Sequence, residues 1–93
     1  MAKFLVLWTL EQGLLSQQMA RAVVKMPDYG AELAAQGKVV ARYHMVGGHG
    51  GAWIYDVDSN EELELLLAKA PAFNFARYDI RPLADMAAPP VLE

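Results

Sequence analysis

Four glycines surround one histidine in the middle of this 93-residue chain, in the run Gly47-Gly48-His49-Gly50-Gly51. Residues rich in strand formers flank this run on both sides, at 38–46 and at 52–57. Two such segments joined by a short glycine-rich loop predict a β-hairpin. Every other element of the fold therefore has to be arranged around a central antiparallel pair.

The residues before the hairpin predict a strand and then an interrupted helix. Residues 4–10 form a continuous apolar run, which fits a strand buried on both faces. Residues 17–26 and 31–36 have helical spacing, and Pro27 interrupts the helix because proline lacks the N–H that a helix interior needs. Gly37 is positioned to end it.

The residues after the hairpin predict a second helix and a final strand. Ser59 and Glu62 have the spacing of a capping box, and Pro71 stops the helix that they begin. Residues 76–81 read as a strand that Pro82 ends. The order is therefore βαββαβ, which predicts an α+β ferredoxin-like plait, with a four-stranded antiparallel sheet and its helices on one face.

The chain is too short for two independent cores, so we expect one ferredoxin-like domain over residues 1–83. Residues 84–93 are rich in Ala and Pro and read as an irregular tail. Its last two residues, Leu92-Glu93, have the form of an expression-vector remnant and are given no weight.

The face of the sheet without helices is expected to be apolar, because residues 4–10 are apolar at every position except Thr9. An exposed apolar face of this kind usually marks an interface. We therefore predict a homodimer or a higher homo-oligomer packed through its sheets, that is, a dimeric α+β barrel.

Composition excludes several classes of protein. The formal net charge of −3 argues against a nucleic-acid partner, which needs a basic surface. The absence of cysteine excludes disulfides, thiolate metal sites and cysteine nucleophiles. The apolar run 4–10 is too short to cross a membrane, so a cytoplasmic protein without a membrane partner is expected.

The hairpin also predicts which side chains share a face of the sheet. If the five loop residues are placed symmetrically, His44 faces Ile54 and Arg42 faces Asp56. One face then carries Arg42, His44 and Asp56, and the other carries Tyr43, Met45, Trp53 and Tyr55. These two sets of side chains have a purely structural explanation, in which Arg42 and Asp56 form a cross-strand ion pair and the aromatic side chains belong to the core.

His49 has two interpretations. A hairpin turn needs one or two glycines, so four small residues around an imidazole suggest a general acid–base group beside a ligand cleft. The alternative, which composition alone slightly favours, is a solvated loop with a spectator histidine. His44 and His49 do not have the spacing of a helical metal motif, so no metal site is expected.

Between residues 37 and 83 the chain resembles the muconolactone Δ-isomerase family. The shared features are a glycine that stops the helix, a strand ending in a Gly-His loop, and a strand ending Ile54-Tyr55-Asp56-Val57. Four further features follow in the same order: Ser59, Glu61 with Leu63, Pro71 and Phe73. The resemblance covers about half of the chain, and the order of elements agrees over all of it.

The resemblance implies a small, cofactor-free isomerase that moves a proton within an unsaturated lactone carrying a carboxylate. His49 is then the first candidate for the acid–base residue and His44 the second. Arg42 is the candidate cation for the carboxylate, because a guanidinium binds carboxylates bidentately. The candidate walls of the substrate pocket are Tyr43, Trp53 and Tyr55.

Other functions of the same fold remain open. One is an enzyme of a related dimeric α+β barrel family, such as a polyketide-type cyclase, a monooxygenase-like enzyme or a YCII-like protein. Another is a non-catalytic subunit that binds a small ligand. A family resemblance predicts the fold better than it predicts the reaction, because proteins with this fold catalyse many different reactions. The expected partner is in each case a small molecule.

Overall fold

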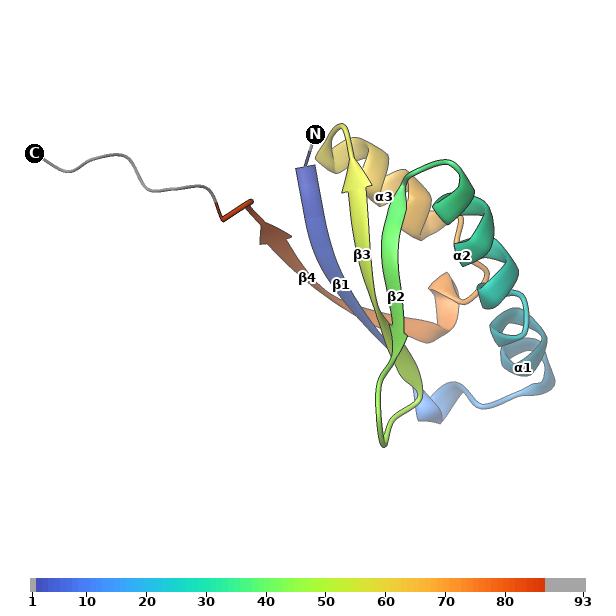
Figure 1. Ribbon diagram of the computed structural model, residues 1–93. Coiled ribbons are helices and arrows are strands. Elements are labelled where there is room, and N and C mark those ends of the chain that lie inside the picture. Colours follow the sequence, from blue (N-terminus) through green and yellow to red (C-terminus); the bar gives the residue numbers. More distant parts are fainter. Residues whose placement is uncertain (1, 87–93) are drawn as a thin grey trace, which may run out of the picture.

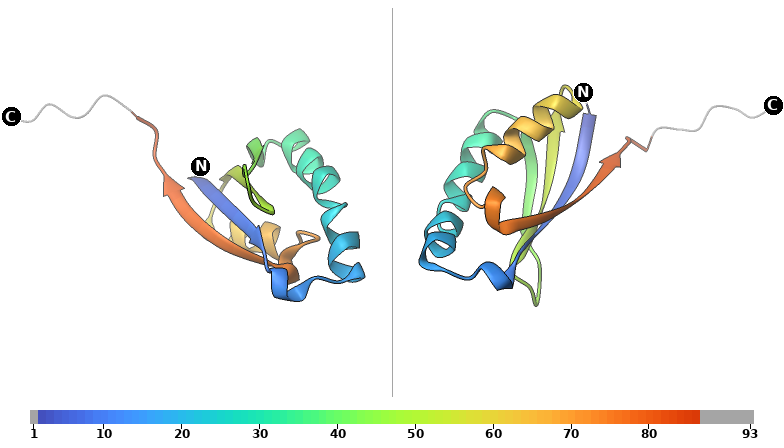
Figure 2. Two further views of the ribbon diagram at one scale, coloured as in Figure 1. Left: turned by 90° about the horizontal axis from the view of Figure 1, so that it is seen from below. Right: turned by 180° about the vertical axis from the view of Figure 1, so that it is seen from behind.

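The computed structural model describes residues 2–86, and these residues follow the predicted βαββαβ order (Figure 1). The four strands form one antiparallel sheet in the order β2-β3-β1-β4. The helices cover one face of this sheet and leave the other open (Figure 2). The ferredoxin-like α+β fold is therefore confirmed. The elements are β1 (Ala2–Leu10), η1 (Gln12–Leu14), α1 (Gln17–Val23), α2 (Met26–Ala35), β2 (Val39–His44), β3 (Gly50–Val57), α3 (Asn60–Ala68), η2 (Phe73–Phe75) and β4 (Ala76–Leu83).

The first helix is interrupted as predicted, but the break precedes the proline. α1 ends at Val23, and α2 begins at Met26 with Pro27 in its first turn. Proline is tolerated there because the first backbone N–H groups of a helix have no intrahelical acceptor. Gly37 follows α2 with a φ of +75°, which confirms it as the helix stop.

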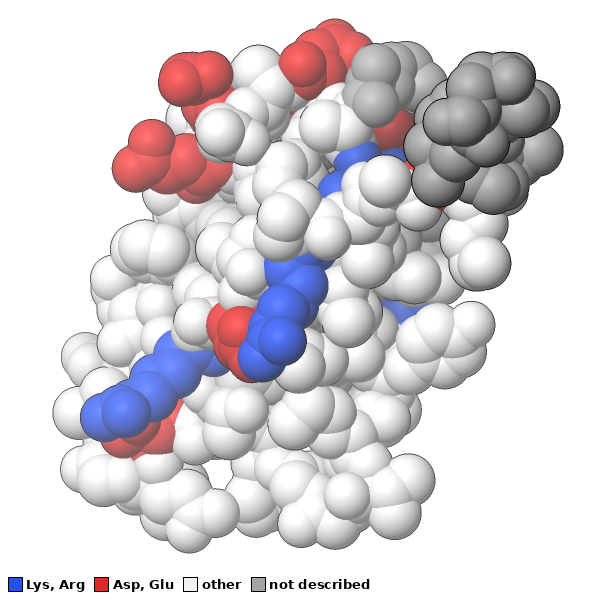
Figure 3. All heavy atoms as spheres, turned by 90° about the vertical axis from the view of Figure 1, so that its left-hand side faces the viewer, with Lys and Arg blue, Asp and Glu red and all other residues white. Residues whose placement is uncertain are grey.

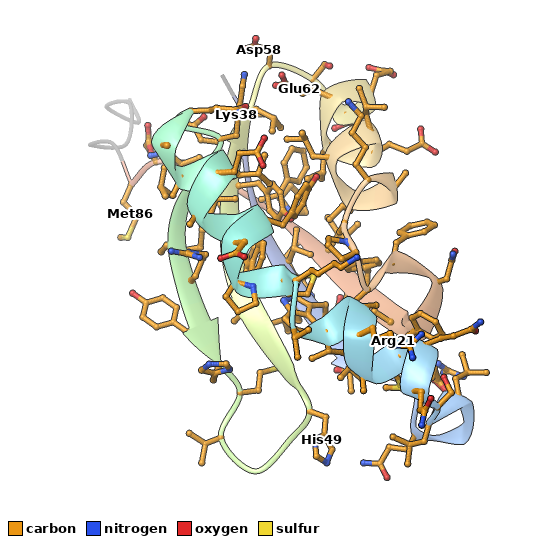
Figure 4. The ribbon with its side chains drawn as sticks, turned by 90° about the vertical axis from the view of Figure 1, so that its right-hand side faces the viewer. Arg21, Lys38, His49, Asp58, Glu62 and Met86 are labelled. Carbon is orange, nitrogen blue, oxygen red and sulfur yellow. The ribbon has the colours of Figure 1, made fainter. Side chains whose placement is uncertain are left out.

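The start of α3 is fixed by the predicted cap. Ser59 Oγ accepts a hydrogen bond from the Glu62 backbone N–H at 3.1 Å, and Glu62 Oε1 accepts one from the Asp58 N–H at 2.8 Å. Lys38 Nζ lies 2.9 Å from the other carboxylate oxygen of Glu62. Figure 4 shows these three charged residues together at one end of the molecule. The segment after α2 is therefore tied to the start of α3.

The core lies between the helices and the two central strands. Alternate residues of β1 and β3 are buried on the helix side, and side chains of α2 and α3 pack over them. The expectation that residues 4–10 are buried on both faces is wrong for the single chain, because Leu5 and Leu7 are only half-buried on the open face. The largest core contributors are Phe4, Val6, Trp8, Leu33, Trp53, Tyr55, Val57, Leu63 and Leu67.

The open face of the sheet carries apolar side chains on its central strands and charged side chains beside them, and Figure 3 shows both kinds near the middle of the view. Leu5 and Ile54 pair across β1 and β3 there and are half-buried. Charge enters from β4, where Arg81 pairs with Asp79 at 3.2 Å and Arg77 pairs with Glu11. The predicted apolar character therefore holds for Leu5 and Ile54 but not for the β4 side of the face, and the packing of a second copy on it stays a prediction.

The register of the hairpin differs from the symmetric one. Arg42 faces Trp53, not Asp56, and His44 faces Gly51, not Ile54. The reason is that Gly50 and Gly51 belong to β3, which leaves a short turn closed by a hydrogen bond from the Met45 N–H to the Gly50 carbonyl at 3.2 Å.

A β-bulge between Val39 and Ala41 then shifts the pairing by one more residue. The predicted division of the two faces is therefore wrong. Arg42 and His44 share the helix side of the sheet with Trp53 and Tyr55, and Tyr43 points to the opposite side.

Three of the four glycines near His49 have structural reasons, and for Gly51 the reason is that a Cβ would lie 2.8 Å from Trp8 Nε1. Gly47 has a φ of +79° within the turn, a conformation that side-chain-bearing residues rarely adopt. A Cβ on Gly50 would lie 1.9 Å from the Trp8 carbonyl oxygen, so only glycine allows β3 to approach β1 here. These glycines can therefore be explained without the predicted open space around His49.

The end of the described chain has no regular structure after Leu83. Most of the predicted irregular tail, 84–93, lies outside the described residues and stays a prediction. Within residues 2–86, no helix combines the length and the apolar character that crossing a membrane requires.

Candidate active site

A cavity of about 490 Å³ lies between the helix side of the hairpin and the junction of α1 with α2. Most of its wall is apolar, and an arginine and a histidine supply the polar groups. The two-residue break between the helices forms one side, because Val24 within it and the flanking Val23 and Met26 line the cavity. The lining residues are Trp8, Val23, Val24, Met26, Pro27, Arg42, Tyr43, His44 and Trp53.

Two tryptophans form the aromatic part of the wall. Trp8 of β1 and Trp53 of β3 meet edge to face, with ring centroids 6.0 Å apart and an interplanar angle of 90°. Both are nearly buried, at 8% and 5% exposure, so their positions are fixed by packing. A flat unsaturated ring is the kind of ligand that such a surface suits.

Arg42 is held against α2. Its Nη1 donates a hydrogen bond to the Pro27 carbonyl oxygen at 3.1 Å. Gly30 of α2 leaves the space for it, since a Cβ there would lie 2.7 Å from Arg42 Nη1. The expected ion pair with Asp56 is wrong, because the register separates the two, and no carboxylate of residues 2–86 pairs with Arg42. Its charge is therefore available to an anionic ligand.

His44 follows Arg42 on the same side of β2. Alternate residues of a strand point the same way and lie about 7 Å apart, so both side chains reach the cavity from the edge strand. His44 is exposed, and Gly51 and Trp8 follow it in one row across the sheet. A cation and an imidazole thus share one wall of the cavity.

The structure gathers most, but not all, of the predicted site residues. Arg42, His44 and Trp53 line the cavity from the helix side of the sheet, and Tyr43 borders it although its side chain points to the opposite side. Tyr55 does not, because it is 2% exposed in the core and stacks on Trp53 with centroids 6.2 Å apart. Burial raises the pKa of Tyr55, so its hydroxyl stays protonated.

His49 lies away from the cavity. It is exposed in the turn between β2 and β3, at the far end of the hairpin from Lys38 (Figure 4). Its backbone carbonyl accepts a hydrogen bond from the Leu10 N–H at 2.8 Å, so the turn is attached to the end of β1. His44, the second candidate of the sequence analysis, is the histidine that the fold brings to the cavity.

Sequence reasoning missed Trp8 and the residues of the helix junction. Trp8 was included in an apolar strand, and only the pairing of β1 with β3 places it at the cavity. Pro27 marked the junction but gave no sign that its carbonyl would bind Arg42. Among the described residues, no three His, Asp or Glu side chains are grouped closely enough to hold a metal ion.

Comparison with known proteins identifies the family. The sequence model described as Muconolactone delta-isomerase matches residues 3–88. The chain belongs to the muconolactone delta-isomerase family. This confirms the resemblance inferred from the sequence and extends it over both halves of the chain.

Two individual proteins resemble this chain, one in sequence and one in fold. The muconolactone Delta-isomerase of Cupriavidus pinatubonensis (strain JMP 134 / LMG 1197) is 36% identical over 56 residues, which are 60% of this chain and 61% of that protein. The match thus spans under two thirds of the relative's length. A crystal structure of muconolactone isomerase at 3.3 Å superposes with a TM-score of 0.79 at 17% identity. The superposition covers 98% of this chain and 97% of the other, so the two proteins share one fold.

Proposed function

We propose that this family member is an isomerase that moves a proton within an unsaturated lactone carrying a carboxylate. The observation that supports it is the pairing of Arg42 with His44 on one wall of an otherwise apolar cavity. Its volume, about 490 Å³, falls in the usual range for pockets that bind small molecules. One charged anchor and one acid–base group are what the reaction requires.

The chemistry assigns a separate task to each residue. Arg42 binds the carboxylate of the substrate, and the bond to Pro27 fixes the guanidinium in place. The His44 imidazole takes a proton from a carbon next to the unsaturated system, and the C–H electron pair moves into the conjugated carbonyl to give an enolate. The imidazolium then returns the proton to a different carbon, so substrate and product have the same atoms.

Paired histidine variants test this assignment. We expect His44→Ala to lower kcat on an unsaturated lactone acid by roughly 10²–10⁴-fold, the usual contribution of a positioned acid–base group. His49→Ala is the matched control, because His49 is exposed in the turn outside the cavity, and it should keep wild-type turnover. Full activity in His44→Ala, or loss of activity only in His49→Ala, would contradict the proposal.

Arg42 is tested separately through binding. Arg42→Lys keeps the charge but loses the planar fork, so KM for the carboxylate substrate should rise while kcat changes less. The matching neutral ester of the substrate should bind the wild-type protein and the variant about equally. Equal KM values for the acid in both proteins would contradict the role of Arg42.

A second candidate follows from the paired tryptophans. Their edge-to-face arrangement suits an aromatic or polyketide-type ring, so an enzyme of a related family with the same fold remains the alternative. Turnover of lactone acids supports the isomerase. Tight binding of aromatic acids without lactone turnover supports the alternative.

We also propose that the protein forms a homodimer or a higher homo-oligomer through the open face of its sheet. The support is a group of half-buried apolar side chains on the two central strands of that face, Leu5, Leu7 and Ile54. A second copy packed there would bury the apolar side chains that the helices leave uncovered.

A further inference from the structure

The indole N–H of Trp8 is a buried donor at the edge of the cavity. Trp8 is 8% exposed, and its Nε1 finds no hydrogen-bond acceptor among the residues that the structure describes. Buried polar groups in folded proteins nearly always have a partner, so an orphaned donor requires an explanation. Asp56 Oδ1 and Tyr78 OH are also without partners, but neither residue lines this cavity.

The position of the donor is set by a glycine. Trp8 faces Gly51 on β3, and Gly51 faces His44 on β2, so the three residues form one row across the sheet. A Cβ on Gly51 would lie 2.8 Å from Trp8 Nε1 and 2.9 Å from the Tyr43 carbonyl oxygen. The nitrogen edge of the indole therefore lies over Gly51, the residue that separates Trp8 from His44 in this row.

This row provides a donor beside the acid–base residue, and the neighbouring row provides the cation. Arg42 faces Trp53 two residues along β2 from His44, which is a separation of about 7 Å. A lactone whose carboxylate is bound by Arg42 would place its ring close to His44 and the Trp8 edge.

We propose that the Trp8 indole N–H donates a hydrogen bond to the carbonyl oxygen of the lactone, where negative charge develops as the enolate forms. This inference rests on the proposed isomerase function. Proton transfer to His44 moves the electron pair onto that oxygen, and a donor already fixed by packing stabilises the charge without reorganisation. Gly51 is the positioning residue, because any side chain there would displace the indole.

An isosteric replacement tests the N–H without changing the packing. Benzothienylalanine at position 8 keeps the bicyclic ring but has sulfur in place of the N–H. We expect kcat to fall by about 10²–10³-fold, the usual cost of losing one donor to a developing oxyanion, with a smaller change in KM. Unchanged kcat in this variant overturns the inference.

A pair of glycine variants tests the position of the indole. Gly51→Ala should lower kcat because its Cβ displaces Nε1. Gly48→Ala is the matched control, because a Cβ there meets nothing within 4 Å, and it should keep wild-type kcat. Should Gly51→Ala fail to fold, the position 8 replacement still decides the question. A folded Gly51→Ala with full kcat counts against the inference.

A spectroscopic measurement separates this inference from the proposed function. The chain has two tryptophans, so its ¹H–¹⁵N spectrum has two indole resonances, and Trp8→Phe assigns them. The probe is a saturated γ-lactone carrying a carboxymethyl group, which binds but cannot isomerise. We expect the Trp8 indole proton to move downfield at saturation.

The outcomes are distinct. If the Trp8 resonance moves while the wild-type protein turns over no unsaturated lactone, the proposed function fails and the donor site stands. If the protein is an active isomerase but the Trp8 resonance stays in place at saturation, the inference fails alone. Failure of the probe to bind overturns both.

Discussion

The substitution Gly30→Ala sets two opposing effects against each other in α2. In an exposed helix, alanine in place of glycine stabilises by about 1 kcal/mol. Gly30 is buried, however, and a Cβ there would lie 2.8 Å from Trp53 Cη2 and 2.7 Å from Arg42 Nη1. The arginine is exposed and its displacement gives up only the hydrogen bond to the Pro27 carbonyl, so this displacement costs little stability.

The tryptophan decides the balance. Trp53 is 5% exposed, meets Trp8 edge to face and stacks on Tyr55, so it has little room to move away from a new methyl group. Overpacking of this kind costs about 1–3 kcal/mol. After the gain in helix propensity is subtracted, we expect Gly30→Ala to lower the free energy of unfolding by about 1 kcal/mol. For a domain of this size that lowers Tm by about 4–8 °C.

Urea unfolding monitored by tryptophan fluorescence measures this change. Ala31→Gly, at the next and exposed position of α2, is the control that measures the propensity effect alone, and it should lose about 1 kcal/mol. Displacement of Arg42 should also raise KM for a carboxylate substrate. A Gly30→Ala protein that is about 1 kcal/mol more stable than wild type would refute the packing of α2 on Trp53.

Three further predictions concern other parts of the fold. Gly50→Ala should destabilise by about 2 kcal/mol or more, because its Cβ meets the Trp8 carbonyl, while Gly48→Ala should stay within about 0.5 kcal/mol in the same urea assay. The Asp58 N–H and the Lys38 ammonium hold the pKa of Glu62 below its ordinary value. The stability they confer is therefore present above about pH 5 and lost as pH falls through the depressed pKa, so wild type should lose more stability than Glu62→Gln between pH 7 and about pH 3. Light scattering at micromolar concentration should give at least twice the mass of the chain, and a monomer would contradict the proposed packing of open sheet faces.

Local signals predicted the helix boundaries well. Ser59 caps α3, and Gly37 ends α2 with positive φ, because both effects depend on residues within one turn. The break near Pro27 was also predicted, although the helix resumes one residue before the proline rather than after it. The sequence shows that proline disrupts a helix, but only the packed structure shows that it starts the second one.

The composition of the site was harder to predict, because it depends on which residues of two strands face each other. The four-glycine loop suggested a symmetric turn, yet two of its glycines pair as strand residues. Their reason for being glycine lies in β1, through the close approach of Trp8. Since β1 is about forty residues away along the chain, no local pattern near His49 contained that information.

The bulge in β2 explains how one short strand serves both the core and the cavity. Val39 is 3% exposed beneath the helices, whereas Arg42 and His44 line the cavity on the same side of the sheet. In a regular strand, residues 39 and 42 point to opposite faces. Val40, the extra residue at the bulge, restores them to one side. If Val40 instead continued the regular alternation of the strand, the arginine and the histidine would lie on the open face, among the apolar side chains that we expect a second copy to cover. The position of the proposed active site therefore depends on the bulge by which the edge strand accommodates one extra residue.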